Sequence, residues 1–180
     1  MIIVMGVPGA GKSTVLSVAA EAGWSVLNYG DLMMEIAKGE GIADRDQLRK
    51  QPAEVQKKIQ KKVGERLAKE KKRELILDTH CSISTPGGYL PGLPFALLER
   101  LHVERLVYIT AKPEEIMKRR AKDPTRSRND QDLERLIEHD LINRAYLAAY
   151  SALTGAPAKI IINADGQVER TQAEFRALLA

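Results

Sequence analysis

A short glycine-rich segment near the N-terminus constrains this chain more than any other feature of its sequence. Residues 6–14 read Gly-Val-Pro-Gly-Ala-Gly-Lys-Ser-Thr and fit the pattern G-x-x-x-x-G-K-[ST]. An apolar run at 2–5 precedes the segment and a stretch with helical periodicity follows it, which is the context that a phosphate-binding loop requires. Glycine is needed because a side chain would hold phosphates away from the inward-pointing N–H groups. The sequence therefore predicts a site for nucleotide phosphates.

The loop residues have distinct expected roles. Lys12 should neutralise the β and γ phosphates, and the Ser13 hydroxyl should bind Mg²⁺ brought in with ATP. The helix that begins near Lys12 adds the positive end of its dipole. The residues expected to bind the nucleotide are Gly6, Val7, Pro8, Gly9, Ala10, Gly11, Lys12, Ser13 and Thr14. A structural glycine turn with a lysine beside it by chance is the alternative.

The remaining sequence alternates between short apolar runs and helical patterns. The runs expected as strands are 2–5, 25–28, 74–77, 105–110 and 159–162. The patterns expected as helices are 12–21, 32–38, 53–72, 94–101, 113–122, 130–153 and 171–179. Because the runs are uniformly apolar, their sheet should be parallel and covered on both faces. The predicted class is α/β, a five-stranded parallel sheet flanked by helices around a P-loop core.

A length of 180 residues fits a single domain. Two stretches interrupt the alternation and are expected to be functional appendages of that domain. The first is the helical region 30–73, and the second is the polar, Pro-interrupted loop 122–130.

Composition narrows the choice of partners. The 28 Lys and Arg exceed the 24 Asp and Glu, giving a net charge of +4 that weakly favours anionic ligands. Lysines crowd the region 57–73, but Val55, Ile59, Val63 and Leu67 are spaced i, i+4 and predict a buried stripe with the lysines in water. Few aromatic residues are available for stacking on bases, so nucleic acid is an unlikely partner.

Two further features bear on the cellular compartment. Cys81 is the single cysteine, so no intrachain disulfide can form, which fits a reducing environment. No apolar run approaches the length of a membrane span, and the first residues lack the features of a signal peptide. A cytoplasmic protein without a membrane partner is expected.

Asp78 follows the third predicted strand, at the edge of the sheet where ligands bind in α/β proteins. It is expected to hold Mg²⁺ directly or through water, the alternative being a turn cap. His80, two residues on, could contact substrate or only shape the loop. His102 and His139 are expected at the solvent or at helix caps rather than in catalysis.

Arginines gather around the polar loop, at the end of one predicted helix, on the loop and at the start of the next. Together they could close over a phosphate chain as a catalytic lid: Arg119, Arg120, Arg126, Arg128 and Arg135, of which all but Arg120 are expected to be catalytic. Pairing with nearby carboxylates at the surface is the alternative. Arg45 and Arg49 form a second cationic group in the region 30–73, so two phosphorylated substrates are expected. A nucleoside monophosphate would need no general base, because its second pKa is about 6.

The chain resembles the archaeal type of adenylate kinase over nearly its whole length. The segments that support the resemblance are 7–14, 44–50, 78–80, 85–94 with Gly-Tyr-Leu-Pro-Gly-Leu-Pro, and 153–156. The resemblance implies the reaction ATP + AMP ⇌ 2 ADP with Mg²⁺, an AMP-binding role for the region 30–73, a closing lid and a homotrimer. The residues expected to contact AMP are Asp31, Arg45, Arg49, His80 and Tyr89.

The chain departs from the bacterial and eukaryotic members at two places. No arginine follows soon after Gly30-Asp31, and Thr79-His80-Cys81-Ser82 stands where those members have Gly-Phe-Pro-Arg after the aspartate. Arg45 and Arg49 are the proposed substitutes for the two missing arginines. The alternatives to an adenylate kinase are a P-loop kinase of another monophosphate or of a small hydroxyl compound, and a nucleotide-dependent RNA or ribosome assembly factor.

Overall fold

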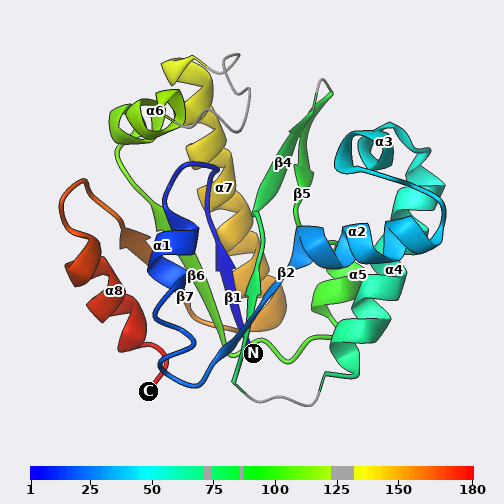
Figure 1. Cartoon of the computed structure of the whole chain (residues 1–180), viewed down its shortest axis with the longest axis horizontal. Helices are drawn as coiled ribbons and strands as arrows, with labels where there is room; N and C mark the ends of the chain where they lie inside the picture. Colours follow the sequence, from blue (N-terminus) through cyan, green and yellow to red (C-terminus); the bar gives the residue numbers. More distant parts are fainter. Residues whose placement is uncertain (71–73, 86, 123–131) are drawn as a thin grey trace.

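The computed structural model describes residues 1–70, 74–85, 87–122 and 132–180. Within these ranges, five parallel strands form one sheet in the order β2-β3-β1-β6-β7 (Figure 1). The strands are β1 (Ile2–Met5), β2 (Ser25–Asn28), β3 (Leu75–Asp78), β6 (Arg105–Thr110) and β7 (Ala158–Ile162). The predicted α/β class with a parallel sheet flanked by helices is confirmed.

Alternating side chains of the central strands enter two separate cores. Ile3 and Met5 of β1 belong to one apolar cluster, whereas Ile2 and Val4 belong to another. Helices α1 (Lys12–Leu16) and α8 (Val168–Arg176) cover the second cluster. Helices α2 (Tyr29–Gly39), α4 (Ala53–Ala68), α5 (Phe95–Leu98) and α7 (Leu133–Thr154) supply the first (Figure 1). A sheet buried on both faces explains why its strands are apolar throughout.

The region between β2 and β3, which is predicted to be an appendage, is helical and runs from α2 through α3 (Arg45–Lys50) to α4. On α4, Ile59, Val63 and Leu67 are buried as the i, i+4 spacing predicts. Two of its exposed lysines, Lys58 and Lys62, form ion pairs with Glu40 on the neighbouring segment. The lysine-rich face is therefore solvated and engaged in ion pairs within the appendage.

An antiparallel hairpin was not predicted from the sequence. Strands β4 (Ser82–Thr85) and β5 (Gly88–Pro91) pair with each other and project past the main sheet (Figure 1). The Pro-Gly-Gly sequence at 86–88 could have revealed the hairpin, since the dipeptides Pro-Gly and Gly-Gly mark tight turns.

The predicted helix 12–21 is wrong at its C-terminal half, because α1 ends at Leu16. The carbonyl of Thr14 accepts hydrogen bonds from the Ser17 hydroxyl at 2.8 Å and from the Gln172 amide at 2.8 Å. A serine side chain that bonds the preceding turn competes with helix continuation, and the chain proceeds through turns to Gly23.

Helix α6 (Pro113–Ala121) ends near its predicted boundary, and the polar loop that follows falls within residues 123–131, outside the described residues. The division of the chain into core, appendage and lid stays a prediction. No helix in the described ranges is both long and apolar enough to cross a membrane.

Candidate active site

The glycine-rich segment connects β1 to α1 at the carboxyl end of the sheet. Gly9 and Gly11 have φ angles of 90° and 86°, which residues with a side chain rarely adopt. Gly6 lies directly against the backbone carbonyl of Ile109, where a Cβ atom would collide. The loop therefore depends on glycine for its backbone conformation at two positions and for close packing on β6 at a third.

Lys12 and Asp78 meet in front of this loop. The Lys12 Nζ atom lies 3.4 Å from Asp78 Oδ1, and the two side chains are 12% and 14% exposed. The pair forms because β1 and β3 are adjacent strands, so α1 begins beside the end of β3. Burial of this kind strengthens the interaction between opposite charges relative to a surface pair.

The two oxygens of Asp78 are in different situations. Asn28 Nδ2 donates a hydrogen bond to Asp78 Oδ2 at 2.9 Å. Among the described residues, Oδ1 is buried and accepts no hydrogen bond. The Ser13 hydroxyl, in the first turn of α1, is exposed on the same loop. A carboxylate oxygen that accepts no hydrogen bond among the described residues and a hydroxyl on the adjoining loop are the kind of oxygen donors that Mg²⁺ prefers.

Two of the residues expected to contact AMP lie near the junction of β2 and α2. Asn28 caps α2 by accepting a hydrogen bond from the Asp31 N–H at 3.1 Å. Arg45 of α3 donates to the Asp31 carboxylate at 2.7 Å, and both side chains are largely exposed. The structure thus brings Asp31 and Arg45 together. Arg49 lies in α3, but its side chain is outside what the structure describes.

His80 contacts the phosphate loop. Its Nδ1 atom lies 3.1 Å from the Gly6 carbonyl oxygen. A carbonyl can only accept, so the ring donates from Nδ1. The His80 pKa is lowered to about 4, mainly because the ring loses hydration and also because the positive charge of Lys12 disfavours a protonated ring. Although part of the residue reaches solvent, His80 is neutral at pH 7.

His139 is not at the solvent or at a helix cap, so that prediction is wrong. It is buried on α7, where its Nε2 atom lies 3.2 Å from the Ser82 hydroxyl. Ser82 in turn donates to Asn143 Oδ1 at 2.7 Å. The Tyr89 ring lies over the imidazole with centroids 5.0 Å apart. Burial lowers the His139 pKa, and the group joins the hairpin to α7.

The arginines on α6 hold the phosphate loop from outside. Arg119 donates to Asp165 Oδ1 at 2.8 Å and 2.6 Å and to the Asn163 carbonyl at 2.8 Å. Arg120 Nε donates to the Pro8 carbonyl at 2.8 Å. Arg135 is exposed in the first turns of α7. Arg126 and Arg128 lie outside the described residues, so the catalytic lid stays a prediction.

Comparisons with known proteins agree with this geometry. Residues 5–137 match a family described as an AAA domain. An adenylate kinase from Methanopyrus kandleri is 48% identical over 181 residues, covering 97% of this chain and 95% of the relative. One from Methanocaldococcus jannaschii is 42% identical over 187 residues, covering 99% and 97%. The chain belongs to the adenylate kinase family.

The structural comparison adds a fold neighbour. A shikimate kinase from Bacteroides thetaiotaomicron superposes with a TM-score of 0.62 at 14% identity, over 99% of this chain and 97% of that one. At this identity the likeness shows the shared fold alone. The adenylate kinase family predicted from the sequence segments is confirmed by the relatives, and with it a nucleotide-dependent phosphotransferase.

Sequence reasoning missed residues that complete the site of this adenylate kinase. Asn163, at the end of β7, donates from its side chain to the Ala10 carbonyl at 2.9 Å and so anchors the phosphate loop. A pocket of about 150 Å³ adjoins the loop, lined by Gly11, Thr14, Arg119, Asn163, Ala164, Asp165, Gly166 and Val168. No local motif marks Asn163 or Asp165, because strand order alone brings β7 beside the loop.

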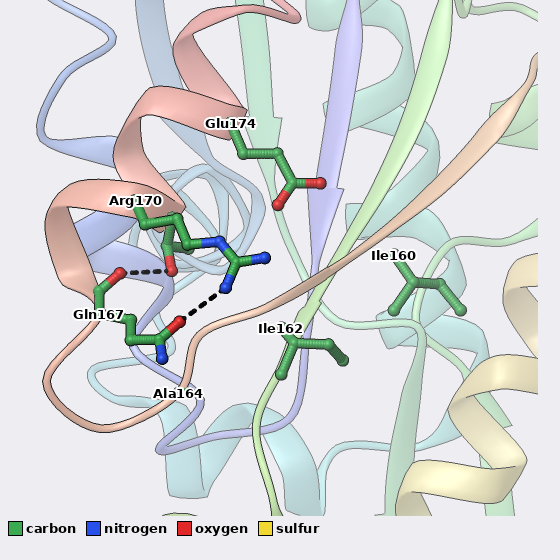
Figure 2. A pocket seen from close by; sticks show the side chains of 7 residues that line it. Ile160, Ile162, Ala164, Gln167, Arg170 and Glu174 are labelled. Atoms are coloured by element: carbon green, nitrogen blue, oxygen red, sulfur yellow. Dashed lines mark hydrogen bonds between the residues drawn. The ribbon is translucent and has the colours of Figure 1, made fainter.

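A second depression, of about 190 Å³, lies between β7 and α8 (Figure 2). Arg170 donates to the Gln167 side chain at 3.0 Å, and Lys159 pairs with Glu174 at 3.0 Å. Ile160 and Ile162 form its apolar side. Its charged side chains, Arg170 and Glu174, already have polar partners, so the depression offers no chemistry comparable to that of the phosphate loop.

Proposed function

We propose how this chain performs the adenylate kinase reaction, ATP + AMP ⇌ 2 ADP, between the phosphate loop and the helical appendage. The observation that supports it most is the Lys12–Asp78 pair, which stands where β3 ends and α1 begins. The same carboxylate is connected through Asn28 to α2, where the acceptor-side charges Asp31 and Arg45 begin. Donor and acceptor sites thus share one edge of the sheet.

On the donor side, loop N–H groups and Lys12 hold the phosphates of ATP, and the residues of the 150 Å³ pocket hold the nucleoside. Ser13 and Asp78 would hold Mg²⁺, which when bound neutralises phosphate charge. The Asn163 and Arg119 contacts to the Ala10 carbonyl fix the loop before the nucleotide arrives. A loop fixed in advance loses less entropy on binding.

On the acceptor side, Arg45 and Arg49 bind the phosphate of AMP, with Asp31 and Tyr89 as further contacts. Asp31 orients Arg45 through their 2.7 Å ion pair. The phosphate oxygen of AMP is already ionised at neutral pH, so it attacks without a general base. His80 is consistent with this, because its lowered pKa of about 4 makes the ring a weak base, and its Nδ1 atom is engaged with the Gly6 carbonyl of the loop.

The transition state spreads negative charge over the transferred phosphoryl group. Arg119, Arg126, Arg128 and Arg135 are proposed to surround that charge when the lid over 122–130 closes. Lid closure also excludes water and so suppresses hydrolysis of ATP. Arg119 contributes through its position beside the loop, where Asp165 holds its guanidinium.

One assay panel tests the proposal. ATP is supplied with AMP, CMP, UMP, GMP or no acceptor, and diphosphate formation is followed. Rapid formation of ADP with AMP alone is expected, with loss of activity in Lys12→Ala and Arg128→Ala. Turnover that needs no monophosphate would instead indicate a kinase of a hydroxyl compound, and salt-sensitive RNA binding with feeble turnover would indicate an assembly factor.

A homotrimer and a cytoplasmic location are proposed on the resemblance. For self-association, the surface to test is a row on α7 formed by Leu133, Ile137 and Leu141, which are spaced i, i+4 and are 38%, 40% and 61% exposed. Light scattering should give three times the chain mass for the wild type. The variant Leu141→Glu should shift the protein toward the monomer if this row lies in the interface.

A further inference from the structure

We propose that Asn28 is a positioning residue that fixes the orientation of Asp78 and joins it to the first turn of the acceptor helix α2. The inference rests on the proposed function, because it takes Asp78 as the carboxylate that holds Mg²⁺. Asn28 does not belong to any recognisable sequence motif.

Both ends of the Asn28 amide are engaged. The Nδ2 atom donates to Asp78 Oδ2 at 2.9 Å, while the Oδ1 atom accepts from the Asp31 N–H at 3.1 Å. An amide turned by 180° would place its oxygen against a carboxylate and its NH₂ group against an N–H donor. The two bonds therefore allow one orientation of the side chain only.

This arrangement determines which oxygen of Asp78 faces Lys12 in front of the phosphate loop. Asn28 and Asp78 are register partners on the adjacent strands β2 and β3, so the amide reaches the carboxylate from the side. With Oδ2 held, Oδ1 points to Lys12 Nζ at 3.4 Å and, within the described residues, accepts no hydrogen bond. A partner that holds one oxygen of a ligating carboxylate orients the other toward the ion.

The same amide reaches the acceptor side. Asp31, whose N–H is bonded to Asn28, accepts from Arg45 through its carboxylate at 2.7 Å. Gly30 permits the packing, because a Cβ atom there would lie 3.2 Å from Asn28 Oδ1 and 3.3 Å from an Arg45 nitrogen. An unbroken series of polar contacts thus runs from Asp78 to Arg45.

A role as helix cap alone is the competing explanation. Asparagine is a favoured N-cap residue, and so is serine. A serine at position 28 keeps an oxygen for the Asp31 N–H, but its hydroxyl stands one bond short of the atom that reaches Asp78. Asn28→Ser therefore removes the contact to the carboxylate and retains the cap, whereas Asn28→Ala removes both.

The experiment measures binding without turnover. Calorimetry gives the affinity of the full-length protein for AMP-PNP, an ATP analogue whose γ group is not transferred, with and without Mg²⁺. The readout is the ratio of the affinity with Mg²⁺ to the affinity without it. The variant Asp78→Asn serves as the reference, because it shows this ratio when the carboxylate is absent. Loss of a partner that orients a metal ligand costs about 10- to 100-fold in metal affinity. The ratio should fall about 10-fold or more in both Asn28→Ser and Asn28→Ala.

Stability and turnover complete the test. Asn28→Ala should lower the urea midpoint further than Asn28→Ser, because it loses the cap in addition to the contact with Asp78. A wild-type ratio in Asn28→Ser would overturn the proposal and leave Asn28 as a cap. A wild-type protein whose AMP-PNP affinity does not respond to Mg²⁺ would also overturn it. If the ratio behaves as expected but no ADP forms from ATP and AMP, the proposed function fails and the positioning role stands.

Discussion

The Lys12 ammonium and the Asp78 carboxylate form an ion pair of 3.4 Å at the point where β3 ends and α1 begins. Each side chain comes from a different strand–helix unit, and the pair exists because β1 and β3 are neighbours in the sheet. In the proposed function, this pair places the cation that binds phosphate next to the carboxylate that would hold a metal ion. The chemistry proposed for this chain starts from that juxtaposition.

Replacing Lys12 by alanine should reduce kcat/KM for ADP formation by about 10² to 10³-fold, the usual loss when one group that stabilises transition-state charge is removed. The measurement is a coupled assay with ATP and AMP. Lys57→Ala is the matched control, because Lys57 is an exposed lysine on α4 that pairs with Glu54. Equal activity of the two variants would contradict the role given to Lys12.

Arg45 and Arg66 form a matched pair for testing the acceptor site. Arg45 bonds Asp31 at 2.7 Å and Arg66 bonds Glu35 at 2.7 Å, with similar exposure. Arg45→Ala should raise the KM for AMP about 10-fold or more, since a charge-assisted contact to phosphate is lost, and leave the KM for ATP nearly unchanged. Arg66→Ala should change neither constant. Steady-state kinetics with each substrate varied decides between these outcomes.

The conformation of the phosphate loop can be tested at Gly11. Its φ of 86° and the closeness of the Asn163 amide leave no room for a methyl group. Gly11→Ala should lower the free energy of unfolding by at least about 1–2 kcal/mol and weaken ATP binding. Gly39→Ala is the control, because a Cβ at this helical position would have open space and alanine favours helix. Urea denaturation should show opposite signs for the two variants.

The lowered pKa of His80 predicts that the stability of the folded protein depends on pH. Its pKa is lowered to about 4 in the folded protein, whereas an unfolded histidine titrates near 6.5. Between these values the unfolded chain binds more protons, so stability falls as the pH is lowered from about 6.5 to 4, and this loss is complete below pH 4.

The measurement compares the wild type with His80→Gln across this pH range. Because part of His80 reaches solvent, the wild type should lose only about 1 kcal/mol relative to the variant. An NMR titration should show the ring neutral down to pH values well below 6. Protonation of His80 near pH 6.5 would refute the assignment of a neutral ring bonded to Gly6.

Features that depend on the local spacing of residues could be predicted from the sequence. The phosphate loop could be recognised because its glycines and lysine follow a fixed order between a strand and a helix. The buried stripe on α4 followed from a helical period that holds whatever the helix packs against. The hairpin β4–β5 was also accessible in principle, since its turn dipeptides are local signals.

Other parts of the candidate site could not be predicted from local sequence patterns. The contact from Asn28 to Asp78 and that from Asn163 to Ala10 join segments far apart in the chain. They arise because the strand order β2-β3-β1-β6-β7 brings several strand ends to one edge. His139 illustrates the same point, because its burial depends on the hairpin packing against α7.

The class of fold and the phosphate loop could be inferred from the amino-acid sequence alone. Those properties reside in residue type and short-range periodicity, which act before the chain is folded. The folded arrangement was needed to see which oxygen of Asp78 faces Lys12, which ring nitrogen of His80 donates to Gly6 and which side chains anchor the loop. These depend on distances between side chains from different strands and helices, which are set when the sheet assembles.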